Sequence, residues 1–270
     1  MQLRNPFRDH GSMSALKTRA DIYGRHYAID RCLRRCLRSI AGDSNDPLPK
    51  DLVSELYAHW GDPLAQSGED YLRSCFAEAR KADGHILQCG TSLLTLLLGA
   101  LCAASGNKNK QLWCLEHDGH WANLMRSWIT QYEVTASHVI TARAELFGPY
   151  VWYAIDPARL ADRFSLVLCD GSNATPQGVL GTLDRLTDRL ALDAVILVRK
   201  VGKAADLKAL AQWAETHNAA CAVVDKREGF IKISCRGSRP TPASTASRSA
   251  PKLATVRAPE REKPPAASSA

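Results

Sequence analysis

A strand, a glycine turn, a helix and a second strand follow one another early in the chain, and this order constrains the fold more than any other feature. The apolar run His85–Cys89 is too short for an independent helix and stops at Gly90, as a buried parallel strand does. Residues 92–104 are almost all apolar and rich in Leu and Ala, and a glycine-asparagine pair then ends the run, which predicts a helix. Residues 112–115 form a second apolar run. Together these runs predict one strand-helix-strand unit of a parallel sheet.

The turn, and the acidic residue after the second run, narrow the ligand that such a unit can bind. Glu116 lies about 25 positions after the turn, where an acidic side chain accepts hydrogen bonds from ribose hydroxyls. A pyrophosphate needs several glycines for close backbone approach, but the turn keeps only Gly90, with Ser92 and Thr95 where further glycines are expected. A nucleoside with a small zwitterionic tail fits better, and S-adenosylmethionine is the common cofactor of that description. The alternative is an ordinary strand-helix-strand unit that binds nothing.

The positive charge of the chain is concentrated at its two ends. The net charge is +7 over 270 residues; the first 40 carry nine Lys or Arg against three Asp, and residues 237–270 carry six against two Glu. The segment between them is therefore net negative, so the basic total is poor evidence for a nucleic-acid-binding active site. Residues 237–270 consist mostly of Pro, Ser, Ala, Thr and Arg, which predicts a disordered tail.

The first 40 residues also predict an amphipathic basic helix. Over residues 14–40, apolar side chains recur at nearly helical spacing and arginines occupy other positions. The helix either contacts an acidic partner, RNA or a membrane surface, or packs on the main domain with a solvated arginine face, and the second interpretation is favoured. Cys32 and Cys36 lie one helical turn apart, but no second pair of ligands has a suitable spacing.

The remaining cysteines and the hydropathy of the chain bound the class of protein. Most of the nine cysteines lie inside apolar runs and no Cys-x-x-Cys occurs, so we expect neither a disulfide nor a metal site. No run approaches the roughly 18 apolar residues of a membrane span, and the first residues lack the apolar core of a signal peptide. We therefore expect a cytoplasmic protein.

Beyond Glu116, strands and helices continue to alternate. Further strands are expected at 134–140, 164–169, 194–198, 221–224 and Phe230–Cys235, and the last two are close enough to pair as an antiparallel hairpin. Seven strands in this order predict an α/β fold: a doubly wound, mostly parallel sheet with an antiparallel last strand. We divide the chain into a helical extension (1–66), the sheet domain (67–236) and the tail (237–270). Ser67 and Asp70 are expected to form a capping box at the start of the helix before the first strand.

Four motifs occur along the sheet domain in a fixed order. They read ILQCGTSLLTLLLG at residues 86–99, LEHD at 115–118, GPYVWY at 148–153 and LVLCDG at 166–171. This series resembles the Rossmann-like S-adenosylmethionine-dependent methyltransferases, especially bacterial members, over residues 69–236. The resemblance implies the seven-stranded fold just described, methyl transfer as the activity and S-adenosylmethionine as the cofactor.

The resemblance also implies a role for each matching residue on the cofactor side. Gly90 would let the methionine part of the cofactor approach the backbone, Glu116 would bond the ribose and His117 would lie against the adenine. A turn at Ala144 and Glu145 would flank the adenine edge. The complete set expected to bind the cofactor is Gln88, Gly90, Ser92, Thr95, Glu116, His117, Ala144, Glu145 and Asp170.

On the acceptor side, the resemblance places Asp170 at the carboxyl end of the fourth strand, facing the transferred methyl group. It would act as the base or orient the acceptor. Trp152 and Tyr153 would line an acceptor pocket, unless they are buried in the core. Asn173 and Lys200 complete the expected substrate-binding set.

Departures from the family pattern give rise to the competing hypotheses. Gln88 replaces the acidic residue of the first motif and Ser92 replaces its second glycine, whereas Gly90 and Glu116 are kept. Arg199 and Lys200 stand where relatives often have acidic residues; this pair cannot bind a metal, but it could hold an anionic substrate. The main hypothesis is methyl transfer to an oxygen or nitrogen of an unidentified acceptor, most simply a small molecule. The alternative is a degenerate, non-catalytic module that acts as an interaction protein through its basic ends. A third hypothesis is a nucleic-acid methyltransferase recruited by those ends.

Overall fold

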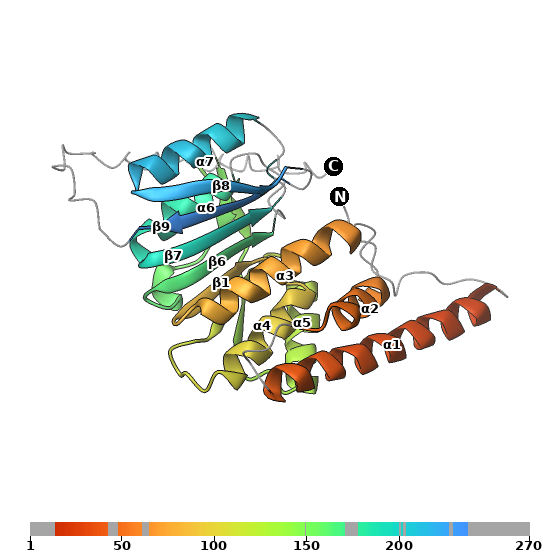
Figure 1. The fold of residues 1–270 in the computed structure, drawn as a ribbon. Coiled ribbons are helices and arrows are strands. Elements are labelled where there is room, and N and C mark those ends of the chain that lie inside the picture. Colours follow the sequence, from red (N-terminus) through yellow and green to blue (C-terminus); the bar gives the residue numbers. More distant parts are fainter. Residues whose placement is uncertain are drawn as a thin grey trace, which may run out of the picture. The chain divides into compact units, whose positions relative to one another are not determined.

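A seven-stranded sheet with helices on both faces forms the centre of the chain (Figure 1). The computed structural model describes residues 14–42, 48–60, 65–148, 150–170, 178–199, 201, 204–226 and 229–236. The helices are α1 (Ser14–Gly42), α2 (Lys50–Trp60), α3 (Ala65–Lys81), α4 (Leu93–Ala104), α5 (Gly119–Gln131), α6 (Gly178–Leu186) and α7 (Ala204–Thr216), with the 3₁₀ turns η1 (Pro157–Arg159) and η2 (Thr187–Arg189). The strands are β1 (His85–Cys89), β2 (Leu112–Glu116), β3 (Ser137–Thr141), β4 (Ala144–Phe147), β5 (Tyr150–Tyr153), β6 (Phe164–Asp170), β7 (Leu190–Arg199), β8 (Ala219–Asp225) and β9 (Phe230–Cys235).

The order of the strands confirms the predicted fold class. The sheet runs β3-β2-β1-β6-β7-β9-β8, and the hairpin strand β9 lies antiparallel between β7 and β8 while the other neighbours are parallel. This is the Rossmann-like methyltransferase fold. The chain moves outward from β1 through β2 to β3 and then returns to place β6 on the other side of β1. The carboxyl ends of β1 and β6 therefore meet at the switch point of the sheet, where doubly wound folds bind their ligands.

The central strands of the sheet are buried on both faces, and each face has its own core. Ile86 of β1 packs with leucines of α4 and with residues of α1, α2 and α3 on one face. Leu87, the next residue, packs with residues of α6 and α7 on the other face. Burial on both faces explains why these strands read as continuous apolar runs and not as alternating ones.

The helical extension shares the first of these cores. Cys32, Leu33 and Ile40 of α1 are fully buried and belong to the same cluster as α4. The polar side of α1 is also tied to the protein, because Arg34 donates to Asp30 at 3.0 Å and Arg31 and Arg35 bond to α2. Packing on the main domain was the favoured interpretation of this helix, and the described part of α1 confirms it.

Three local expectations were wrong. The segment between β3 and β6 contains an antiparallel hairpin, β4 paired with β5, where we expected a turn at Ala144 and Glu145. Helix α3 begins at Ala65, so Ser67 lies inside the helix and is not its N-cap residue. Strand β3 begins at Ser137, and Val134 instead packs in the turn after α5.

Among the described residues, no helix combines the length and the apolar character that a membrane span requires.

Candidate functional site

A sharp turn joins β1 to α4 at the carboxyl end of the central strand. Gly90 adopts φ +90°, a conformation that a side chain would strain, and its amide donates to the Leu115 carbonyl at 2.8 Å. Ser92 then caps α4: its hydroxyl accepts from the Leu94 amide, while the hydroxyl of Thr95 accepts from the Ser92 amide at 3.0 Å. This reciprocal capping box satisfies amides that the first turn of a helix leaves free. The turn is therefore fixed by side-chain hydrogen bonds in place of the further glycines.

Beneath the turn, a buried polar network holds Ser92 and Thr95 in place. Gln88 and Thr95 are both fully buried. The Thr95 hydroxyl donates to Oε1 of Gln88 at 3.0 Å, and Nε2 of Gln88 donates to the Ser92 hydroxyl at 3.3 Å. Each polar group is thus paired with another residue of the predicted cofactor-binding set. Gln88 and Thr95 therefore fix the conformation of the turn through their hydrogen bonds to Ser92.

The carboxylate of Glu116 lies beside the turn at the end of β2 and is surrounded by donors. Only 3% of Glu116 is exposed. Its Oε2 accepts from the Thr91 amide at 2.9 Å and from the Thr91 hydroxyl at 2.8 Å. Its Oε1 accepts from the Asp118 amide at 3.0 Å, and Nδ1 of His117 lies 3.2 Å away. Three hydrogen bonds from this chain thus reach the carboxylate, which has roughly four lone-pair positions, and the His117 ring lies beside it.

Two of these four groups can leave, and two cannot. The amides of Thr91 and Asp118 are fixed by the backbone. The Thr91 hydroxyl moves by rotation of one side-chain bond, and the His117 side chain is 49% exposed. A ligand with two adjacent hydroxyls could therefore replace the second pair without disturbing the first. The amides of Thr91 and Asp118 would keep the turn (residues 90–92) joined to the end of β2 (residues 116–118), an arrangement that we call the clasp.

The start of α5 adds a further contact to the clasp, which was not among the contacts predicted from the sequence. Asp118 is the N-cap of α5, and its carboxylate accepts from the amides of His120 and Trp121 at 2.9 and 3.0 Å. The amides of Trp121 and His120 hold the pKa of Asp118 below its ordinary value. The indole of Trp121 in turn donates to the Thr91 carbonyl at 3.0 Å. An Asp-Gly pair directly before an apolar helical stripe was the available signal for this cap.

The residues expected near the adenine edge and the acceptor are placed differently. Ala144 and Glu145 are exposed on β4, opposite Tyr153 and Trp152 of β5. The two aromatic rings are at most 4% exposed and pack edge to face against each other in the second core. They are core residues in this structure, which was the alternative interpretation. The buried residues of β5 fix the hairpin to the core, and β4, which pairs with β5, is thereby held at the surface.

The carboxyl ends of β6 and β7 bring an acidic and a basic residue into register. The backbone of Asp170, the last residue of β6, pairs with Arg199, the last residue of β7. Arg199 is 5% exposed, and its guanidinium carbon lies 5.5 Å from the centre of the Tyr71 ring. Arg199 is the basic residue that the sequence paired with Lys200 as a possible holder of an anionic substrate, and the structure buries it at this edge. The predicted substrate-binding residues Asn173 and Lys200 lie outside the described residues.

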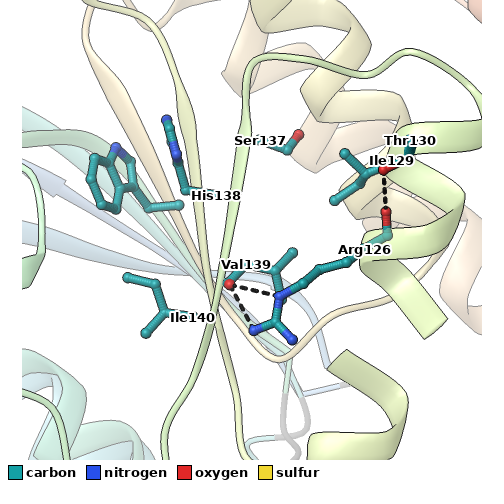
Figure 2. Close-up of a pocket in the computed structure, with 8 residues that line it drawn as sticks. Arg126, Ile129, Thr130, Ser137, His138, Val139 and Ile140 are labelled. Atoms are coloured by element: carbon teal, nitrogen blue, oxygen red, sulfur yellow. Dashed lines mark hydrogen bonds between the residues drawn. The ribbon is translucent and has the colours of Figure 1, made fainter. Parts of the chain in front are cut away.

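A separate depression of about 480 Å³ lies on the outer edge of the sheet, between β3 and α5 (Figure 2). Figure 2 shows Arg126 reaching across it to the Val139 carbonyl, to which Nη2 donates at 3.0 Å. The same nitrogen donates to the Thr141 hydroxyl, and Nη1 donates to Asn123. Arg126 thus occupies an acceptor on the free edge of β3, which protects that edge from pairing with another chain. The depression is not part of the clasp at the carboxyl ends of β1 and β2.

Comparison with known proteins gives likeness in fold only. No protein-family model and no curated protein matches the chain. Among solved structures, it is similar to precorrin-6y C5,15-methyltransferase from Geobacter metallireducens GS-15, with 14% identity over 62% of this chain and 88% of that one and a TM-score of 0.44. It is also similar to cofactor-bound Rv0187 from MTB (20% identity, 70% and 88% covered, TM-score 0.44) and to the O-methyltransferase NovP (12%, 77% and 99%, 0.44). At these identities and scores, no residue role is transferred from them.

Proposed function

We propose that this protein is an S-adenosylmethionine-dependent methyltransferase that transfers a methyl group to an oxygen or nitrogen of an unidentified acceptor. One observation carries the proposal. A buried carboxylate, Glu116, ends the strand next to a glycine turn at the switch point of a doubly wound sheet, and two of its neighbours, the Thr91 hydroxyl and the His117 ring, can be displaced. An acceptor of two hydrogen bonds at this place in the fold is what the ribose of a nucleoside cofactor requires.

The residues of the clasp fit such a cofactor. The ribose hydroxyls would take the positions of the Thr91 hydroxyl and the His117 ring on Glu116, and the freed His117 ring would be available to lie against the adenine. Gly90 and the start of α4 would face the amino-acid tail. Bound S-adenosylmethionine supplies an electrophilic methyl group, and its transfer is an in-line displacement that depends mainly on positioning.

The other predicted cofactor residues receive narrower roles in this proposal. Gln88, Ser92 and Thr95 would keep the turn in the binding conformation through their mutual hydrogen bonds and would not touch the cofactor with their buried atoms. Ala144 and Glu145 would border the adenine from the exposed strand of the hairpin. Because these residues would position the cofactor and take no part in the reaction, their substitution should lower cofactor affinity more than it lowers the rate of methyl transfer.

For the acceptor, Asp170 is the proposed base or orienting group, at the end of β6 next to the switch point. Arg199, buried beside it at the end of β7, favours an acceptor that carries a negative charge, because a guanidinium binds carboxylates and phosphates with two parallel hydrogen bonds. We assign Asn173 and Lys200 to the same side as proposed substrate contacts. A small anionic molecule is the acceptor class that this edge would take.

The alternative function is a non-catalytic interaction module, and one feature of the clasp favours it. Three hydrogen bonds and the neighbouring His117 ring already surround the Glu116 carboxylate within the chain, so its acceptors have partners without a ligand. If the Thr91 hydroxyl and His117 do not leave, no nucleoside can bind there. The two functions therefore differ in one measurable property, the affinity for the nucleoside.

Isothermal titration calorimetry with S-adenosylhomocysteine tests the proposal directly. We expect binding by the wild-type protein, loss of affinity by about 10-fold or more in Glu116→Gln, and no change in Glu215→Gln, an exposed carboxylate on α7 that serves as the matched control. An absence of both heat and thermal shift at millimolar ligand would refute the enzyme and favour the module. With binding established, Asp170→Asn should abolish turnover of an acceptor while leaving this affinity intact.

A further inference from the structure

Three side chains of different chemical type meet between α1 and α2, and none of them belongs to the clasp. They are Cys32 on α1 and Glu55 and His59 on α2. One sulfur, one carboxylate oxygen and one imidazole nitrogen from these residues all lie within 4.8 Å of one another. In the described part of the chain, no other set of three or more His, Cys, Asp or Glu residues meets this condition.

The helices present this set in a way that suits a cation. Glu55 and His59 are four residues apart, so they lie one above the other on the same face of α2. Cys32 is fully buried and faces them from α1, whereas Glu55 and His59 are partly exposed. A bound ion would therefore have three protein ligands on its inner side and room for water on its outer side. Three protein ligands with one open position for water is the coordination of zinc sites that are not closed by a fourth side chain.

The ligand atoms select the kind of ion. Calcium and magnesium take oxygen ligands, whereas a set of sulfur, nitrogen and oxygen suits zinc, a borderline-soft cation. Around tetrahedral zinc, such atoms lie about 3.5 Å apart, given metal-ligand distances of roughly 2.0–2.3 Å. The observed separations of up to 4.8 Å require the side chains to close by about 1 Å, which side-chain rotation on two packed helices allows.

The neighbouring charges shape this site as well. Arg31 and Arg35 donate to the two oxygens of Glu55, each at 3.3 Å, and the Cys32 thiol also hydrogen-bonds to this carboxylate. The arginine side chains are 58% and 50% exposed, so they can turn toward solvent. On binding, the ion would replace the thiol proton, which is released to solvent, and would take one oxygen of Glu55 from an arginine.

We propose that Cys32, Glu55 and His59 form a binding site for a zinc ion that fastens α1 to α2. The site departs from the sequence-based expectation of no metal, because Glu55 and His59 lie far from Cys32 in the chain and join it only through helix packing. It does not depend on methyl transfer. Its effect would be to stabilise the helical layer that covers the first core.

Cobalt substitution provides the direct test. Full-length, tag-free protein would be reduced, freed of metal with a chelator and titrated with Co²⁺, followed by competition with Zn²⁺. We expect one ion per chain, thiolate-to-cobalt charge-transfer absorption, and the intense visible bands of tetrahedral cobalt. Cys32→Ser should abolish the charge-transfer band, and His59→Gln should weaken zinc affinity by at least about 10-fold. Zn²⁺, but not Mg²⁺, should raise the melting temperature of the wild type, and this rise should be smaller in Cys32→Ser and His59→Gln.

Two matched controls separate this site from adventitious thiol binding. Cys36→Ser removes the other buried thiol of α1, one helical turn away, and His120→Gln removes an exposed histidine on α5. Both variants should keep the wild-type spectrum and affinity. Wild-type affinity in His59→Gln, a spectrum without thiolate character, or loss of the band in Cys36→Ser would each overturn the assignment. If Cys32→Ser does not fold, His59→Gln decides, because its side chain lies at the helix surface.

Discussion

Replacement of Thr91 by valine should make the protein bind S-adenosylhomocysteine more tightly, although it removes a hydrogen bond from the site. The Thr91 hydroxyl donates to Oε2 of Glu116 at 2.8 Å, in a position that we assign to a ribose hydroxyl. Valine keeps the shape and branching of threonine but cannot donate. The Thr91 amide, which donates to the same oxygen at 2.9 Å, is retained, so the clasp itself should persist.

The magnitude follows from what the free protein loses. A hydrogen bond to a charged group contributes about 1.5–3 kcal/mol, and Glu116 is only 3% exposed, so water replaces the missing donor poorly. We expect the free energy of unfolding to fall by about 1–2 kcal/mol in the absence of ligand. The ribose hydroxyl supplies the missing donor in the complex, so most of this loss should return as affinity, a gain of roughly 5- to 30-fold.

Two measurements on the same protein check this linkage. Calorimetric titration gives the affinity, and urea unfolding with and without ligand gives the two stabilities. Thr91→Ser, which keeps the hydroxyl, is the control and should bind like the wild type. Weaker binding by Thr91→Val would refute the reasoning, because it would mean that the Thr91 hydroxyl contacts the ligand itself. Unchanged stability in the absence of ligand would show that the bond contributes nothing to the free protein.

Three further predictions concern the elements that support the clasp. Asp118→Ala should cost about 1 kcal/mol of unfolding free energy, measured by urea unfolding; since the pKa of Asp118 is lowered on folding, this difference should be fully present above the ordinary pKa of aspartate and should vanish as the pH falls through the lowered value. Gly99→Ala should cost about 1–3 kcal/mol, because its methyl group would overlap side chains of β3 and the preceding turn, whereas Gly24→Ala, in open space on α1, should stabilise by about 0.5–1 kcal/mol. Tyr132→Phe should lower stability by about 0.5–1.5 kcal/mol and raise the pKa of Asp30, which an NMR titration would detect, because the Tyr132 hydroxyl donates to Asp30 at 2.9 Å.

The sequence predicted the architecture because its strands are apolar runs bounded by turn residues. The glycine turn, the acidic end of β2 and the antiparallel hairpin of β8 and β9 are local patterns, and each predicts its element without knowledge of the rest. The segment between β3 and β6 was harder. Its residues 144–147 and Tyr150–Tyr153 pair only with each other, and no alternation of apolar and polar residues marks their exposed strand. A single pair of strands therefore left too weak a signal.

The candidate site was predictable in its outline but not in its bonding. Glu116 and Gly90 could be recognised from spacing, because the fold fixes where strand ends meet. The donors on Glu116 could not, since Thr91 and Asp118 reach it only after the turn and the cap have formed. Gln88 illustrates the same limit. Its substitution for an acidic residue looked like the loss of a ligand contact, whereas the structure gives the amide two partners in the turn network, Ser92 and Thr95, and a third in the Cys114 thiol of β2.

The ion pairs of α1 bear on the hypothesis of a nucleic-acid substrate. Arg31 and Arg35 bond to Glu55, and Arg34 bonds to Asp30, so each would have to leave an internal acid to neutralise a phosphate. Each phosphate contact to single-stranded RNA contributes about −0.7 to the slope of log affinity against log salt concentration. Glu55→Gln releases two arginines and should steepen that slope by up to about 1.4. Arg31→Gln should have the same slope as the wild type. A slope in Arg31→Gln that is shallower than that of the wild type by about 0.7 would show instead that α1 already contacts RNA. The basic helix α1 would then belong to the substrate site.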